Sequence, residues 1–276
     1  MRSGMRSGAR IVAALVLAGV VLGAALACRE ARPAPIAADS DAAFTVDGRI
    51  ALHSLMSLGD GHLQEMADVL TLLANTDAAR SAEWDVIRPG LEDAARATVP
   101  AVLWFALPDG SYWTLAEGRA STSLADRPYF PRLLEGRTVI GDLVVSKSTH
   151  RNTAIVAVPV RDRDGSVVGA LGSSVHLDGL SAQIRQEMGG LDDNLLFFAI
   201  DSEPLGALHS DPEMIFTEPM ELGDEGMRRA FAEIVSGEEG VVTYTFRDSG
   251  RTVLYRRSQV TGWWYGFGVI GPLGVA

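Results

Sequence analysis

The chain has 276 residues, of which 47% are hydrophobic and 21% are charged, which are the proportions of an ordinary globular protein. Its net charge of −11 disfavours nucleic acid and anionic lipid headgroups as partners, because both carry charge of the same sign. A single cysteine, Cys28, excludes an intramolecular disulfide, so the fold must depend on its apolar core.

The first 28 residues have the layout of an export signal. Arg2, Arg6 and Arg10 form a basic start, and residues 11–27 then run without a charge. The run ends in Ala-Leu-Ala-Cys, which resembles a lipoprotein signal with Cys28 as the lipidated residue that anchors the chain to a membrane. Two other interpretations stay open. One is a cleaved signal without lipid; the other is an uncleaved anchor, since 17 apolar residues lie at the lower limit for a membrane-spanning helix.

All three interpretations predict export to the bacterial cell envelope, in the periplasm or on the outer surface. Removal of residues 1–27, which hold three arginines and no acidic residue, would leave 21 basic and 35 acidic residues and a net charge of −14. Residues 29–41 are rich in Ala and Pro, which predicts a tether between the signal and the first folded domain.

Apolar residues recur at helical spacing from Phe44 to Leu73, which predicts one long helix with its weakest point at Gly59 and Gly61. Asp60 and His62 are expected on the surface of this helix. Ser81 is a candidate N-cap for a second helix through Ala97. Pro89 is expected to break that helix.

From Val99 the periodicity changes to that of strands separated by turns. Five strands are predicted at Val102–Leu107, Tyr112–Leu115, Val139–Ser146, Ala154–Val160 and Val167–Val175. A helix over Asp178–Met188 then ends at two glycines. This order predicts an α+β fold with a half-covered antiparallel sheet, in a first domain of residues 42–188.

Residues 189–276 repeat this order without clear sequence repetition and form the second predicted domain. Strands are expected at Leu195–Ile200, Val241–Phe246, Thr252–Tyr255 and Trp263–Phe267, with a helix at Met227–Val235.

The segment Asp126–Leu177 carries the functional signal. It begins with Asp-Arg-Pro-Tyr-Phe at residues 126–130, continues through Val-Val-Ser-Lys-Ser-Thr at 144–149, and closes with the strand Val167–Val175. That order resembles the ligand-pocket half of a double Cache domain, the extracytoplasmic PAS-like sensor module of bacterial chemoreceptors and sensor kinases. The resemblance implies a long N-terminal helix and two PAS-like lobes, each an antiparallel sheet with flanking helices. It also implies a small-molecule sensor, and without a kinase, cyclase or methyl-accepting region in the sequence we expect no output domain.

The resemblance implies that Arg127, Tyr129 and Phe130 lie on a loop that covers the ligand pocket. A guanidinium group can bind a carboxylate through two parallel hydrogen bonds, and aromatic walls exclude water. The alternative is that Arg127 pairs with Asp126 or caps backbone carbonyls while the rings fill the core. Trp104 and Trp113, with Tyr112, are expected on the strands of the pocket floor, where core packing is the alternative role.

Relatives that bind amino acids carry two acids that hold the ligand's ammonium group. Ser146 occupies the first place here, and Ser173 or Ser174 occupies the second. An ammonium without a counter-charge is costly in a dry pocket, so a carboxylate or another anionic or neutral small molecule is expected instead. Lys147, the only lysine, is a candidate contact, although successive strand residues alternate faces and it could equally point to solvent.

No cofactor, metal site or catalytic residue is expected. The five histidines lack metal-ligand spacing, and there is no Gly-x-Ser-x-Gly motif. The leading hypothesis is therefore a binding module whose partners are a small molecule and a membrane signalling protein. A second hypothesis is an envelope interaction protein with a filled pocket, which docks to a separate signalling partner. An envelope hydrolase that uses Ser146 is the third.

Overall fold

The computed structural model describes residues 47–272, so the signal segment, Cys28 and the tether lie outside the described residues. The long helix α2 (Gly48–Ala74) leads into a first lobe with a six-stranded antiparallel sheet in the order β3-β2-β1-β6-β5-β4. The other elements of this lobe are α3 (Asp77–Arg80), α4 (Trp84–Ala97), β1 (Ala101–Ala106), β2 (Ser111–Thr114), β3 (Gly118–Ser123), α5 (Phe130–Leu134), β4 (Val139–Val145), β5 (Asn152–Arg161), β6 (Val167–His176) and α6 (Leu177–Glu187).

The second lobe has a five-stranded antiparallel sheet in the order β8-β7-β11-β10-β9. Its elements are β7 (Leu195–Ile200), β8 (Gly206–His209), η1 (Pro212–Met214), α7 (Pro219–Leu222), α8 (Glu225–Ser236), β9 (Glu239–Phe246), β10 (Ser249–Arg257) and β11 (Trp264–Gly271). Strands β9 and β10 meet at a two-residue turn, in which Arg247 and Asp248 have φ of 51° and 58°. Two consecutive positive φ values match the twist of an antiparallel hairpin.

Asp47 is the N-cap of helix α2, and its side chain accepts the backbone N–H of Arg49; the helix then runs without interruption through Gly59 and Gly61. Its apolar face includes Leu55, Leu63, Met66 and Leu70, which are fully buried. These side chains join one core cluster with residues of both sheets. The long helix thus supports both lobes through a shared core.

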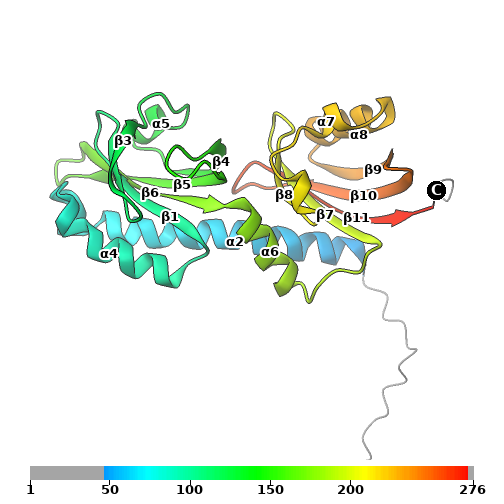
Figure 1. The fold of residues 1–276 in the computed structure, drawn as a ribbon, viewed down its shortest axis with the longest axis horizontal. Helices are drawn as coiled ribbons and strands as arrows, with labels where there is room; N and C mark the ends of the chain where they lie inside the picture. The colour runs from blue at the N-terminus through cyan, green and yellow to red at the C-terminus, as the bar shows by residue number, and fades with distance from the viewer. Residues whose placement is uncertain (1–46, 273–276) are drawn as a thin grey trace, which may run out of the picture. The chain divides into compact units, whose positions relative to one another are not determined.

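The first sheet has two differently covered faces. Figure 1 shows α2 and α4 on one side of this sheet and α5 on the other. Leu103 and Phe105 of β1 pack on the helix face, whereas Trp104 and Ala106 pack with α5 in a separate cluster. Alternation along a strand produces this division, because successive side chains point to opposite faces. The face under α5 is the one that holds the candidate site.

The predicted α+β class and the two lobes on one helix are confirmed. The sequence pattern missed the short strands β3 and β8 and the short helix α7. Pro89 lies inside α4 without ending it. None of the helices within residues 47–272 combines the length and apolar character that a membrane crossing requires.

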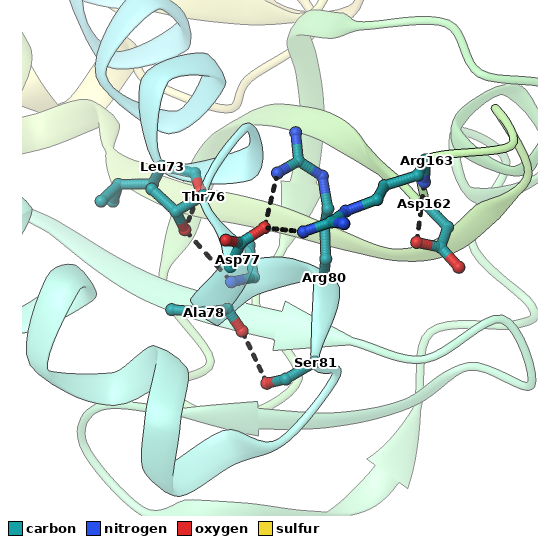
Figure 2. Close-up of polar contacts among 9 residues, drawn as sticks. Leu73, Thr76, Asp77, Ala78, Arg80, Ser81, Asp162 and Arg163 are labelled. Carbon is teal, nitrogen blue, oxygen red and sulfur yellow. Dashed lines mark hydrogen bonds and ion pairs between the residues drawn. The ribbon is translucent and has the colours of Figure 1, made fainter.

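The predicted N-cap role of Ser81 is wrong. Thr76 is the N-cap of α3 and Ser81 is its C-cap, and Figure 2 shows Ser81 Oγ donating to the Ala78 carbonyl, at 2.7 Å. In the same view Asp77 pairs with Arg80 at 3.1 Å and with Arg163 of the β5–β6 turn at 3.4 Å. The chain thus forms a short extra helix before α4, and α4 itself begins without a side-chain cap.

Candidate functional site

A small cavity lies on the α5 face of the first sheet, beneath residues 124–129, which we call the cover loop. Its volume is about 20 Å³, which is room for about one water molecule. The cavity is lined by side chains from the cover loop, the sheet and the turn after β4, among them Trp104, Arg127, Tyr129, Ser146, Lys147 and Ser174. The structure therefore brings most of the predicted site residues together around one small space.

Arg127 lies in the cover loop and bridges it to the end of β4. Its Nη2 donates to the Val145 carbonyl at 2.6 Å, whereas its Nε is buried without a hydrogen-bond partner among the described residues. Buried N–H groups are nearly always paired, so an unpaired one calls for an explanation. The contact with the Val145 carbonyl corresponds to the carbonyl-capping role that is the alternative for Arg127. The unpaired Nε remains as a donor for a ligand.

Lys147, in the turn after β4, also fixes the cover loop. Its Nζ donates to the Ser123 carbonyl at 2.6 Å and forms an ion pair with the Asp126 carboxylate. The hydrogen bond from Lys147 holds the pKa of Asp126 below its usual range. Because the Asp126 side chain is 71% exposed, this pair contributes little to the free energy of unfolding. Its effect is to position the loop.

The turn after β4 is bonded mainly to itself. Ser146 Oγ contacts Ser148 Oγ at 3.3 Å and accepts the backbone N–H of Thr149 at 3.3 Å. Thr149 Oγ1 is buried without a partner among residues 47–272. The turn therefore adds neutral hydroxyl groups to the cavity rim, and no carboxylate lines the described cavity.

Aromatic side chains fill most of the space around the cavity. Trp104, Tyr129 and Phe130 are all at most 3% exposed, and burial raises the pKa of the Tyr129 hydroxyl well above its usual range. Trp104 crosses β6 at Gly172, where an added Cβ would overlap its ring. Phe130 packs in the same cluster without lining the cavity.

Two predicted site residues lie on the opposite face of the sheet. Trp113 stacks on Phe105 at 6.2 Å between ring centroids and packs against the core under α2. Ser173 is fully buried between Leu171 and Val175, which belong to that same core, and its Oγ has no partner within residues 47–272. The next residue, Ser174, lines the cavity instead.

Five cavity residues were not predicted as contacts: Thr114, Leu124, Val144, Ser148 and Ile155. Strand alternation could have placed Thr114 and Val144, once the face of a neighbour such as Trp104 was known. Elsewhere in residues 47–272, no three His, Cys, Asp or Glu side chains are grouped as a metal ion would require.

No protein-family model matches the chain, and no curated protein matches it. Solved structures match it over most of its length. The ligand-binding domain of the Pseudomonas aeruginosa PAO1 amino acid chemoreceptor PctB, solved with L-Arg, gives a TM-score of 0.63 at 17% identity, covering 80% of this chain and 94% of that one.

The ligand-binding domain of the Pseudomonas fluorescens chemoreceptor CtaA, solved with L-serine, gives a TM-score of 0.62 at 15% identity, covering 81% of this chain and 93% of that one. The chain has the fold of a double Cache sensor domain. The extracellular domain of rpHK1S-Z16, a protein described as a histidine kinase, shares this double Cache fold with a TM-score of 0.65 at 14% identity, covering 80% of this chain and 92% of that one.

Proposed function

We propose that the chain is an exported sensor module that binds a small carboxylate in its first lobe. The observation that carries the proposal is Arg127, a cavity residue whose Nε is buried and unpaired among the described residues. Lys147 lies at the same cavity with its charge paired to the Asp126 carboxylate, so Arg127 supplies the positive charge for a ligand, and no acidic side chain of the described residues lines the cavity. Such a site favours an anion, because an arginine fork matches the two oxygens of a carboxylate.

The size of the cavity limits the ligand. The volume of about 20 Å³ is far below the 300 Å³ or more that is typical of pockets for drug-sized ligands. Only a very short carboxylate is close to this size. A larger one requires the cover loop to move away from β4. Two side-chain contacts oppose that movement, from Arg127 to the Val145 carbonyl and from Lys147 to Asp126.

The proposal departs from the ligands of the similar structures. PctB was solved with L-Arg and CtaA with L-serine, and each ligand carries an ammonium group. In this chain Ser146 and Ser174 line the cavity where an acid would be needed, and Asp126 is occupied by Lys147. A buried ammonium without a counter-charge is costly, so the site disfavours amino acids.

A second candidate is an interaction module with a filled first lobe, which docks to a separate membrane signalling protein. The small cavity and the near-complete burial of Trp104, Tyr129 and Phe130 favour it. Arg127 would then be a structural residue that closes the loop. Neither candidate includes catalysis by Ser146, whose hydroxyl has no histidine among its hydrogen-bond partners in the described part of the chain.

Calorimetric titration and thermal shift of residues 29–276 with formate, acetate, propionate and L-alanine separate the two candidates. We expect one or more of the carboxylates to bind and raise Tm, and L-alanine to fail. Arg127→Ala should abolish the shift, whereas Arg119→Ala should retain it, because Arg119 stacks on Trp113 on the opposite face. No response to any carboxylate would reject the ligand proposal and favour the filled lobe.

We also propose that Cys28, outside the described residues, carries a lipid that holds the module at a membrane. Cys28→Ser is expected to move the exported protein from the membrane fraction to the soluble fraction. Fractionation of cells that express each form measures this. Equal distribution of the two forms would contradict the anchor.

A further inference from the structure

Strand β4 carries a bulge at Gly141, at the side of the first lobe that meets the second. The pairing with β5 shifts between Ile140 and Asp142, and Gly141 has a φ of +93°, which glycine adopts without strain. A Cβ at Gly141 would lie 3.0 Å from Thr261 Cβ and 3.3 Å from the Trp263 ring. The bulge therefore leaves room for residues 258–263, the turn between β10 and β11, which we call the inter-lobe turn.

Trp263 connects the inter-lobe turn to β4. Its ring is 1% exposed, and its Nε1 donates to the Gly141 carbonyl at 2.9 Å. A buried hydrogen bond of this kind is costly to break without a replacement, because both groups would lose their partner away from water. The Gly141 carbonyl at the bulge is thus bound by a side chain of the second lobe.

The same turn is connected to α2 through Asp60. This carboxylate accepts hydrogen bonds from Ser258 Oγ at 2.7 Å, Tyr265 OH at 3.0 Å and Thr261 Oγ1 at 3.4 Å. The surface position expected for Asp60 is therefore wrong, and burial raises its pKa. Three donors on one half-buried carboxylate hold the turn and the helix together.

Strand β4 is also connected to the cavity. Beyond the bulge, Val144 lines the cavity and the Val145 carbonyl accepts the hydrogen bond from Arg127. Asp142, next to the bulge, forms an ion pair with Arg132 of α5, the helix that follows the cover loop. A displacement of the cover loop therefore acts on β4 at two points, one of them adjacent to Gly141.

We propose that the Gly141 bulge and the inter-lobe turn couple the state of the first-lobe cavity to the second lobe. This inference rests on the proposed function of that cavity. A carboxylate that binds both Nε and Nη2 of Arg127 competes with the Val145 carbonyl for Nη2. Loss of that hydrogen bond frees the end of β4. The shift at the bulge then weakens the hydrogen bond from Trp263, and the turn transmits the change to β10 and β11 and, through Asp60, to α2.

Hydrogen–deuterium exchange of the full-length chain tests the coupling without a ligand. Arg127→Ala removes the contact with Val145, and we expect exchange in residues 256–265 to rise roughly fivefold, as for the loss of one hydrogen bond. In a Trp263→Phe background the same change should have no effect on that segment. Arg127→Met, which keeps the apolar stem, replaces Arg127→Ala if the latter lowers Tm strongly.

Trp264→Phe is the matched control, because Trp264 Nε1 donates to the Gly237 carbonyl at 2.7 Å within the second lobe. In this background the response to Arg127→Ala should persist. Unchanged exchange in residues 256–265, or a response that survives Trp263→Phe, would overturn the coupling. Failure of every carboxylate to bind would reject the proposed ligand and leave this result standing. Carboxylate binding that leaves exchange in residues 256–265 unchanged would reject the coupling alone.

Discussion

Gly59 and Gly61 lie two residues apart in α2 and have opposite surroundings. A Cβ on Gly59 would lie 2.5 Å from Tyr265 OH, whereas a Cβ on Gly61 would meet nothing within 4 Å. We predict that Gly59→Ala lowers the free energy of unfolding by about 1–3 kcal/mol, because Tyr265 must leave its contact with Asp60. Gly61→Ala should raise it by about 0.5–1 kcal/mol through helix propensity.

Urea unfolding of the two variants beside the wild type measures both effects. Since both substitutions are glycine to alanine in one helix, backbone propensity is matched and only the contact with Tyr265 differs. A stabilising effect of Gly59→Ala equal to that of Gly61→Ala would show that the α2–Tyr265 contact is looser than described.

We predict that His209 in β8 makes the free energy of unfolding depend on pH. It stacks on Phe198, its Nδ1 accepts the Asp211 N–H at 2.8 Å, and burial lowers its pKa to about 4. The unfolded chain takes up this proton near pH 6.5, so between about pH 6.5 and 4 it binds more protons than the native state. Stability should therefore fall as pH is lowered through this range, by about 1–3 kcal/mol from His209.

His209→Asn keeps an acceptor for the Asp211 N–H and removes the titration. Urea unfolding at several pH values from 4 to 7 should give a flatter profile for this variant than for the wild type. His53→Asn, at an exposed position of α2, should keep the wild-type slope. Parallel profiles for His209→Asn and the wild type would contradict the assignment.

The cavity contacts in the cover-loop motif could be predicted from the sequence, whereas those that depend on which face of the sheet a residue occupies could not. Arg127, Tyr129 and Lys147 line the cavity as expected. Ser173 and Trp113 point to the other face, because a one-residue error in register reverses every side chain of a strand. The volume of the cavity depends on ring packing and could not be predicted from the pattern.

Pro89 lies in the interior of α4 at an exposed position. Proline has no N–H to donate to the carbonyl of Asp85, and its ring crowds that turn. We predict that Pro89→Ala raises the free energy of unfolding by about 1–3 kcal/mol. Pro131→Ala, in the first turn of α5, should give no gain, because a proline there replaces no intrahelical hydrogen bond.

Thermal unfolding followed by far-UV circular dichroism measures this difference. A Tm of Pro89→Ala at or below that of the wild type would contradict this prediction.

The strands with apolar alternation were predicted to within a few residues. Strand β3 was missed because Gly118–Ser123 contains only small, polar and charged residues and lies at the edge of the sheet. Strand β8 reads Gly-Ala-Leu-His, in which the two apolar residues are adjacent and do not alternate with polar ones. Pro89 was expected to break a helix that tertiary packing of Ile87 and Leu91 maintains.

Within residues 47–272, α2 contributes to a core shared by both sheets. Leu63 is fully buried in that core, whereas Leu72 on the same helix is 73% exposed. We predict that Leu63→Ala destabilises by about 2–5 kcal/mol and that Leu72→Ala changes stability by less than about 0.5 kcal/mol.

The shared core also predicts that the lobes unfold together. Native-state hydrogen exchange in Leu63→Ala should accelerate by the same factor in the slowest amides of β5 and of β11, because both strands pack on α2. Acceleration confined to one lobe would show that the lobes are separate cooperative units.

The position of Lys147 has a practical consequence. As the only lysine of the chain, it offers the single side-chain amine for acylating dyes, and it lies at the contact that closes the cover loop. Acylation of Lys147 would abolish its ion pair with Asp126. The attached fluorophore would then report on the position of the cover loop. Amine chemistry, which labels most proteins at many sites, would label this one at the α-amino group and beside its cavity.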